Sequence, residues 1–319
     1  MKMNGLRIGV VGVGATGGYL AAALANAGLD VTVLARGRSA EAIRNEGIQV
    51  QGPDGEIMTG RPSVVVTAAD EVRPVDVTLV CVKSYDTQAV ATDIARLVGD
   101  QGLILCLQNG VANEETLAGV YGSGRVLSGV LYIGAERVAP GVIERSTDAR
   151  ITFGPYEGIE VLDTCKAIQT ALQSAGVECS IDERIRSAKW QKYLFNCALN
   201  PLTALTRQRL GRIRSTQPGQ RLFGALLTEA HAAASAAGAP LSADAREEVV
   251  KVADRMNISS SMAEDLAAGR PMELDAFSGH VLRLSEENGT DASVTRVVHE
   301  LLAVLDEHRR DPADAATDK

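Results

Sequence analysis

The feature that most constrains the fold is a glycine-rich segment between a strand pattern and a helix pattern near the N-terminus. Gly12-Val13-Gly14-Ala15-Thr16-Gly17 matches G-x-G-x-x-G, follows an apolar run and opens an Ala/Leu-rich run. The first glycine permits a tight turn, the second lets backbone approach a pyrophosphate, and the third packs helix on strand. Backbone N–H groups and the helix dipole then bind the phosphates. The segment therefore predicts a dinucleotide site in which all six residues are candidate cofactor ligands.

Two other interpretations of this segment remain open. One is a packing turn in a flexible glycine-rich stretch. The other is a signal peptide or membrane anchor, because residues 8–29 form 22 uncharged residues preceded by Lys2 and Arg7. Six of those 22 residues are glycine, and the run splits into a strand-like half and a helical half. We therefore expect no membrane insertion.

Composition narrows the class of protein further. The 319 residues suggest two domains, and 45% apolar residues allow a sizeable core. The net charge of −8 argues against nucleic-acid binding. Five cysteines without a Cys-x-x-Cys pair favour a reducing compartment, so we expect a cytoplasmic protein without disulfides. Four scattered histidines give no support for a metal site.

The order of strand and helix patterns predicts two domains of different class. Over the first 110 residues apolar runs alternate with helical runs, which is typical of a parallel sheet covered on both faces. Glycine-punctuated, antiparallel strands are expected near 125–155, and only helices after about 184. We predict an α/β fold consisting of a doubly wound Rossmann-type domain over 1–183, a helical substrate and catalytic domain over 184–310, and a disordered tail over 311–319. The predicted strands include 6–13, 30–35, 64–67, 77–82, 103–107, 141–144, 150–153 and 176–181, and the predicted helices include 16–27, 39–45, 88–97, 160–175, 221–237, 243–256, 262–268, 272–287 and 294–308.

The end of the second strand indicates which cofactor the chain uses. NAD sites usually place an acid there for the ribose 2′-hydroxyl, but this strand ends at Arg36 and Arg38. Asp30 lies at the opposite end of the strand. Because a guanidinium suits a 2′-phosphate, we predict NADPH/NADP+ rather than NAD, with Arg36 as the candidate ligand. The sequence does not decide between the two arginines, and both could be solvated loop cations.

Two later strand ends carry polar residues. Lys83 follows the strand predicted at 77–82, and Asn109 follows the strand predicted at 103–107. Ligands bind outside the carboxyl ends of parallel strands, so these side chains should face the nicotinamide half of a cofactor. The alternatives are an exposed loop cation and a simple Asn-Gly turn.

In the helical half, one helix face carries three polar residues. Lys192, Asn196 and Asn200 are spaced four apart, so they share a face of one helix. Asparagine is a poor helix-interior residue, and two of them beside a lysine suggest a site. Pro201 removes an N–H and frees the Cys197 carbonyl. The alternative is a solvated face of a kinked helix.

A second polar segment follows at 259–275. Ser261 and Glu264 form a capping-box pattern, and Pro271 at a first helical position would place Glu273 in the first turn. From the residues alone we interpret both features as helix starts.

Taken together, these motifs make the chain resemble the ketopantoate reductase family (2-dehydropantoate 2-reductases) over residues 7 to about 305. The resemblance rests on their order along the chain, from the glycine segment and the Lys83 and Asn109 strand ends to the polar helix and the 259–275 segment. The motifs that carry it are Gly12-Val13-Gly14-Ala15-Thr16-Gly17, Val82-Lys83, Gln108-Asn109-Gly110, Trp190-Gln191-Lys192 with Asn196 and Asn200-Pro201-Leu202-Thr203-Ala204, and Ser260-Ser261-Met262 with Glu273-Leu274-Asp275.

The resemblance implies an active site in the cleft between a Rossmann domain and a helical domain. It also implies NADPH-dependent reduction of 2-dehydropantoate to (R)-pantoate, a step toward pantothenate and coenzyme A. Lys192 would be the catalytic lysine, and Glu273 would act in catalysis and bind substrate and cofactor. The other implied residues are Asn109, Asn196, Asn200 and Ser261 for the substrate, with Lys83 and Asn109 near the nicotinamide.

Departures from the family pattern leave the substrate open. Met272 stands where a threonine is expected before Glu273, and residues 289–293 lack a Gly-x-x-Thr-Pro pattern. The alternatives are a reductase of another 2-oxo acid, an opine-type dehydrogenase, and a regulator that binds NADP without turnover. Lys192 and Glu273 argue against the regulator. The expected partner is a small 2-keto acid, with no nucleic acid and no membrane, and a homodimer stays open.

Overall fold

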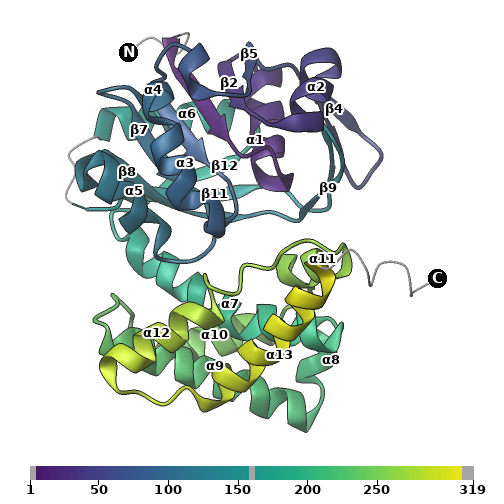
Figure 1. Ribbon diagram of the computed structural model, residues 1–319, viewed down its shortest axis with the longest axis vertical. Coiled ribbons are helices and arrows are strands. Elements are labelled where there is room, and N and C mark those ends of the chain that lie inside the picture. The colour runs from purple at the N-terminus through teal and green to yellow at the C-terminus, as the bar shows by residue number, and fades with distance from the viewer. Residues whose placement is uncertain (1–4, 158–161, 311–319) are drawn as a thin grey trace. The chain divides into compact units, whose positions relative to one another are not determined.

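The computed structural model describes residues 5–157 and 162–310 and divides into two compact units after Arg186 (Figure 1). The first unit contains the strands and the second, over the residues described, contains helices only. The predicted fold class, α/β followed by an all-helical part, is confirmed. The division lies close to the boundary expected after residue 183, and the tail predicted over 311–319 lies outside the described residues.

An eight-stranded sheet forms the centre of the first unit. Its order is β12-β11-β8-β7-β6-β1-β2-β5, and neighbouring strands are parallel except β8 and β11. The six strands from β5 to β8 follow the doubly wound order, which reverses next to β1. The carboxyl ends of β1 and β6 therefore border the crevice where such sheets bind ligands. The strands are β1 (Arg7–Val11), β2 (Asp30–Leu34), β5 (Val64–Val66), β6 (Val77–Val80), β7 (Leu103–Cys106), β8 (Val126–Tyr132), β11 (Arg150–Pro155) and β12 (Glu178–Ile181).

Helices cover both faces of this sheet, which explains why β6 and β7 are buried along their whole length. One apolar cluster joins the sheet to α1 and α6, and a second joins the opposite face to α3, α4 and α5. The single helix predicted over 88–97 is divided into α3 and α4, because Ile94 leaves helical geometry with φ −91° and ψ 8°. The helices of this unit are α1 (Ala15–Asn26), α2 (Gly37–Glu46), α3 (Thr87–Asp93), α4 (Ala95–Val98), α5 (Asn113–Tyr121) and α6 (Leu162–Ser174).

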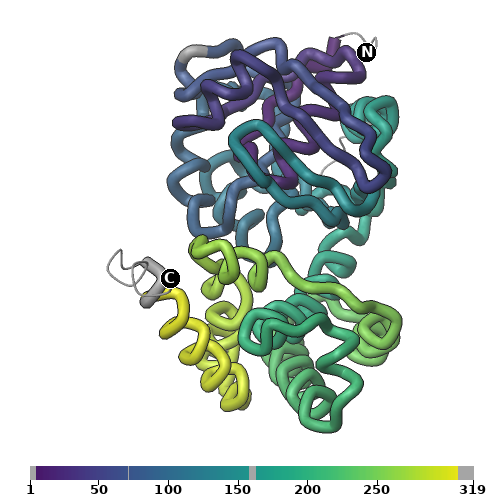
Figure 2. The backbone as a smooth tube through the Cα atoms, turned by 90° about the vertical axis from the view of Figure 1, so that its right-hand side faces the viewer, coloured from purple at the N-terminus to yellow at the C-terminus, as the bar shows by residue number. Residues whose placement is uncertain are grey.

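A four-stranded sheet, ordered β4-β3-β10-β9, packs on the outer side of α1. In Figure 2 its purple strands lie beside its teal strands, although they are far apart in sequence. The approach to α1 is close, because a Cβ added at Gly60 would lie 2.1 Å from the Ala22 carbonyl oxygen. The sequence pattern does not predict β3 and β4, which are short and only partly buried. The strands are β3 (Ile48–Gln51), β4 (Ile57–Gly60), β9 (Ala135–Ala139) and β10 (Val142–Arg145).

In the second unit, a buried carboxylate fixes the start of one long helix. The Glu229 side chain accepts hydrogen bonds from the Val294 N–H, the Thr295 N–H and the Thr295 hydroxyl, so it caps α13 from a neighbouring helix. No helix among the described residues is both long enough and apolar enough to cross a bilayer. The helices are α7 (Ile185–Thr206), α8 (Leu210–Arg214), α9 (Gln217–Ala236), α10 (Ala245–Ala253), α11 (Ser261–Ala267), α12 (Ser278–Asn288) and α13 (Ser293–Arg310).

All five cysteines are free, and burial makes their thiols poor nucleophiles. It raises the pKa of Cys197 to about 12 and that of Cys179 to about 12. Burial also raises the pKa values of Cys81 and Cys165, and Cys106 is fully buried. Among the described residues, no group of three or more His, Cys, Asp and Glu side chains could hold a metal ion.

Candidate functional site

The glycine segment forms the loop between β1 and α1, and its three motif glycines meet different surroundings. Gly12 has φ +94°, and a Cβ there would lie 2.7 Å from the Val82 backbone nitrogen. A Cβ on Gly17 would lie 1.9 Å from the Gly12 carbonyl oxygen, whereas a Cβ on Gly14 would meet no atom within 4 Å. The first glycine therefore permits the turn, the third permits close packing, and the second leaves open space beside the backbone.

The start of α1 is suited to an anion. Its N-cap is Gly14, which brings no side chain to the first-turn N–H groups, and the first turn contains no acid. These N–H groups point along the positive end of the helix dipole. A phosphate placed there would meet no competing carboxylate of the helix itself.

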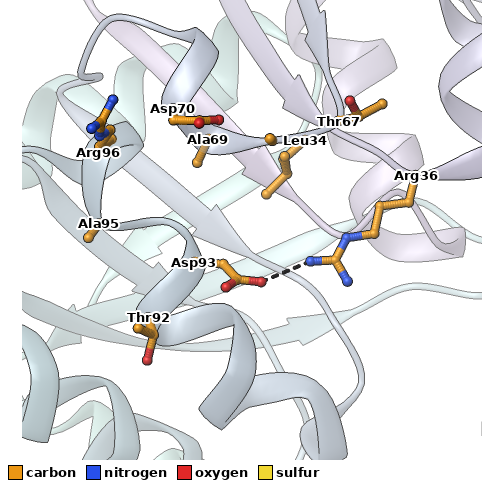
Figure 3. Close-up of a pocket in the computed structure, with 10 residues that line it drawn as sticks. Leu34, Arg36, Thr67, Ala69, Asp70, Thr92, Asp93, Ala95 and Arg96 are labelled. Carbon is orange, nitrogen blue, oxygen red and sulfur yellow. Dashed lines mark hydrogen bonds and ion pairs between the residues drawn. The ribbon is translucent and has the colours of Figure 1, made fainter.

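A cavity of about 470 Å³ lies at the carboxyl ends of β2 and β5 (Figure 3). Arg36, the N-cap residue of α2, lines this cavity and donates from Nη2 to the Asp93 carboxylate at 2.9 Å. The two side chains are 70% and 52% exposed. The described lining residues do not include Arg38, which is exposed on α2. The lining residues are Leu34, Arg36, Thr67, Ala68, Ala69, Asp70, Thr92, Asp93, Ala95 and Arg96.

Lys83 and Asn109 lie in the loops that follow β6 and β7, which are neighbouring parallel strands. Both therefore lie at the same edge of the sheet, as the sequence predicts. The two loops are also linked by hydrogen bonds. The alternatives, an isolated loop cation at Lys83 and an isolated turn at Asn109, do not require such a connection.

A buried network of side chains connects these two loops, and the sequence analysis missed it. The Gln108 amide donates to the Val82 carbonyl at 3.0 Å and to Thr87 Oγ1 at 2.7 Å. Thr87 donates to Asn113 Oδ1 at 2.9 Å, and the Asn113 amide donates to the Asn109 carbonyl at 2.7 Å. Thr87 and Asn113 are the first residues of α3 and α5, so a sequence pattern shows them only as helix starts.

In the second unit, α7 carries Lys192, Asn196 and Asn200 on one face. Asn196 is 9% exposed and Asn200 is 3% exposed, so this face is not solvated and that alternative is wrong. The helix continues through Pro201 to Thr206.

The Lys192 ammonium has an unusual environment. Its pKa is lowered to about 7, mainly by burial and in addition by the neighbouring charge of Lys189, whereas Glu273 acts in the opposite direction. Lys189 is itself only 5% exposed. The structure thus brings Lys192 and Glu273 within electrostatic reach, although 81 residues separate them in sequence.

Glu273 does not lie in a helix, so its interpretation as a first-turn residue is wrong. The helix predicted over 272–287 begins instead at Ser278. Tertiary hydrogen bonds fix the preceding segment, because the Met272 N–H donates to Asp306 and the Tyr193 hydroxyl donates to the Phe277 carbonyl. Glu273 is 6% exposed in this segment, beside α7.

The helix start predicted at Ser261 is shifted by one residue. Ser260 is the N-cap of α11, and its hydroxyl accepts a hydrogen bond from the Ala263 N–H. The same hydroxyl lies 2.7 Å from Thr203 Oγ1, which ties the start of α11 to α7. Ser261 is the first helical residue, and its side chain is exposed. The capping box around Ser261 is therefore wrong, and Ser261 has no capping role there.

Comparisons with known proteins give matches in both units of the chain. The family model described as "Ketopantoate reductase PanE/ApbA" matches residues 8–158, and its C-terminal counterpart matches residues 184–306. The 2-dehydropantoate 2-reductase of Halobacterium salinarum is 32% identical over 301 residues, covering 93% of this chain and 98% of that protein.

Solved structures give the same result. The crystal structure of 2-dehydropantoate 2-reductase from Methylococcus capsulatus is 31% identical with a TM-score of 0.83, covering 96% of this chain and 98% of that one. A ternary structure of D-mandelate dehydrogenase with NADH and anilino(oxo)acetate shares the fold at a TM-score of 0.87 and 17% identity, covering 96% of this chain and 100% of that one. Because family models match both units and a relative above 30% identity covers nearly the whole chain, this protein belongs to the ketopantoate reductase family of NAD(P)-dependent oxidoreductases acting on a CH–OH group.

Proposed function

We propose that this chain reduces 2-dehydropantoate to (R)-pantoate with NADPH, a step toward pantothenate and coenzyme A. The observation that carries the proposal is Lys192, whose pKa is lowered to about 7 on a helix face with two buried asparagines. An acid with a pKa near the working pH is well suited to give a proton to a ketone oxygen. The proposal assigns cofactor binding to the first unit, and the proton and most substrate contacts to the second.

The residues of the first unit fit a dinucleotide. Gly14 leaves open space beside the backbone, and α1 begins without an acid or a capping side chain, as a pyrophosphate site requires. When bound, the cofactor would supply a hydride to the carbonyl carbon of the substrate. We assign the segment from Gly12 to Gly17 to the pyrophosphate and Arg36 to the 2′-phosphate. Lys83 and Asn109 are assigned to the nicotinamide end.

Lys192 has two tasks in the proposed reaction. Its ammonium stabilises the negative charge that develops on the substrate oxygen, and it donates the proton that completes the alcohol. Burial, together with the charge of Lys189, keeps the pKa of Lys192 low enough for this proton transfer near neutral pH. The Glu273 carboxylate favours the protonated form of Lys192 and could accept hydrogen bonds from substrate hydroxyls.

The remaining polar residues are assigned to substrate recognition. Asn196 and Asn200 have amides that can both donate and accept hydrogen bonds. Ser261 presents an exposed hydroxyl at the start of α11, and Asn109 contributes from the first unit. A 2-keto acid with a carboxylate, a ketone and a hydroxyl would use such a mixed set of donors and acceptors.

The preference for NADPH is also part of the proposal. The support is Arg36, a guanidinium that lines the cavity at the end of β2. A charge-assisted hydrogen bond contributes about 1.5–3 kcal/mol, or roughly ten- to a hundredfold in affinity. Arg36→Ala should raise KM for NADPH by about that factor and leave KM for NADH almost unchanged. Equal use of NADH and NADPH by the wild type would contradict this assignment.

A different 2-oxo acid is the second candidate substrate. Met272 favours it, because this buried residue stands where the family pattern has a threonine before Glu273. The test is a panel of 2-keto acids, including aromatic ones, assayed for NADPH oxidation at 340 nm. We expect the highest kcat/KM with 2-dehydropantoate. A higher kcat/KM with another 2-keto acid would identify that acid as the substrate instead. No turnover with any acid of the panel would refute the proposed reductase activity.

The cysteines bear on where the protein is located in the cell. Five free cysteines, four of them buried, suit a reducing compartment, so we assign the protein to the cytoplasm. Light scattering at known concentrations would show whether the protein is a monomer or a homodimer.

A further inference from the structure

The cavity next to β2 contains a charge that the sequence does not connect with the cofactor. Asp93, at the end of α3, lies 57 residues from Arg36 in sequence and forms an ion pair with it at 2.9 Å. Figure 3 shows the two side chains reaching toward each other from different elements of the cavity wall. Asp70 and Arg96 also line the cavity, so its described lining includes two acidic and two basic side chains.

This balance matters for a ligand that carries a phosphate. A phosphate monoester bears about −1.5 to −2 charges near neutral pH. A phosphate that binds Arg36 lies close to the Asp93 carboxylate, and the two anions compete for the same guanidinium N–H donors. A ligand with a hydroxyl at that position adds no charge and leaves the ion pair intact. The Asp93 carboxylate therefore opposes one class of ligand and not the other.

Solvent exposure limits the repulsion between the Asp93 carboxylate and a bound phosphate. Both side chains are more than half exposed, so water and salt screen their interaction, and an exposed pair of this kind is easily broken. The guanidinium is thus oriented over the cavity by a partner that can release it. A buried acid in the same position would exclude a phosphate altogether.

We propose that Asp93 is a specificity-determining residue that orients Arg36 over the cavity and reduces the preference for a 2′-phosphorylated dinucleotide over its 2′-hydroxyl counterpart. This inference rests on the proposed use of NADPH. The carboxylate acts on the adenosine end of the cofactor and should have no effect on the 2-keto acid.

The test compares binding of four ligands to full-length wild type and Asp93→Asn by calorimetry or fluorescence. NADPH and 2′,5′-ADP carry the 2′-phosphate, whereas NADH and 5′-AMP do not. The control is Asp76→Asn, which removes a less exposed ion pair, Arg7–Asp76 at 2.8 Å, at the opposite end of the sheet. It changes the net charge of the protein by the same amount.

We expect Asp93→Asn to bind NADPH and 2′,5′-ADP about three- to tenfold more tightly, with NADH and 5′-AMP within about twofold of wild type. The gain should shrink at 0.5 M salt and in an Arg36→Ala background, and Asp76→Asn should show no gain. Weaker binding of NADH and 5′-AMP by Asp93→Asn would overturn the inference, because Asp93 would then bind the ribose hydroxyl. An unchanged NADPH-to-NADH ratio would also overturn it while leaving the proposed function intact. Failure of the wild type to bind NADPH would refute the proposed function itself.

Discussion

Substitution by alanine at two glycines of the same loop should affect stability differently, and the structure gives the size of each effect. At Gly14, φ is −69° and ψ is −162°, which alanine can adopt, and the new Cβ would meet nothing within 4 Å. Alanine is a poorer N-cap than glycine but reduces the entropy of the unfolded chain, so the two effects roughly cancel. We expect Gly14→Ala to change the free energy of unfolding by less than about 1 kcal/mol.

Cofactor binding should nevertheless fall in Gly14→Ala. The added methyl group would occupy the open space where a pyrophosphate approaches the backbone. Loss of one charge-assisted hydrogen bond from the loop corresponds to about 1.5–3 kcal/mol, or roughly ten- to a hundredfold in the dissociation constant.

Gly17→Ala should instead destabilise the fold. Its Cβ would lie 1.9 Å from the Gly12 carbonyl oxygen and 2.9 Å from Cys81 Cβ. Because the nearest atom is backbone, the loop itself must move, and overpacking of this kind costs about 1–3 kcal/mol. Cofactor binding should fall as well, because the displaced loop contains the other glycines.

Thermal denaturation and NADPH titration of both variants would separate stability from binding. Gly119→Ala is a suitable control, since Gly119 lies inside α5 and a Cβ there would meet nothing within 4 Å. It should be neutral or slightly stabilising and bind NADPH normally. Wild-type NADPH affinity in Gly14→Ala would refute the inference that phosphate approaches this backbone. Wild-type stability in Gly17→Ala would refute the close packing of the loop.

Four further predictions concern the turnover and the stability that depend on Lys192, the cap of α13 and the buried network. With the pKa of Lys192 near 7, reduction should slow as pH rises through about 7, and Lys192→Ala should lower kcat at least about 100-fold; near-normal turnover would remove its assignment. Because this pKa lies below the ordinary value of 10.5, the unfolded state binds more protons than the folded state between pH 7 and 10. The free energy of unfolding of the wild type should therefore rise over this range, and Lys192→Met should abolish the rise. Glu229→Gln should lower the free energy of unfolding in urea by about 1–2 kcal/mol with unchanged kcat, and equal stability would show that the cap of α13 does not need the charge. Asn113→Ala breaks the hydrogen bonds to Thr87 and to the Asn109 carbonyl. It should raise KM for NADPH even when KM is measured well below the melting temperature of the variant. An unchanged KM would make the network purely structural.

The sequence predicts features that depend on neighbouring residues and misses those that depend on distant ones. The glycine segment and the stripe on α7 are predicted correctly, since a turn and a helix face are local properties. Glu273 is assigned to a helix wrongly, because hydrogen bonds to Asp306 and from Tyr193 override the local proline signal. Asp93 gives no signal at all, since only the fold brings it to Arg36.

The distribution of the cysteines has a practical consequence for measuring how each unit opens. Four of them, Cys81, Cys106, Cys165 and Cys179, belong to the first unit, and Cys197 alone belongs to the second. Burial raises the pKa values of Cys81, Cys165, Cys179 and Cys197, so the folded protein contains little thiolate at these sites. A thiol reagent should therefore react mainly after the surrounding structure opens. The rate of modification at Cys197, followed by mass spectrometry of its peptide, would therefore report fluctuations of the lysine-bearing helix. The other four sites would report the first unit separately, without any label being engineered into the protein.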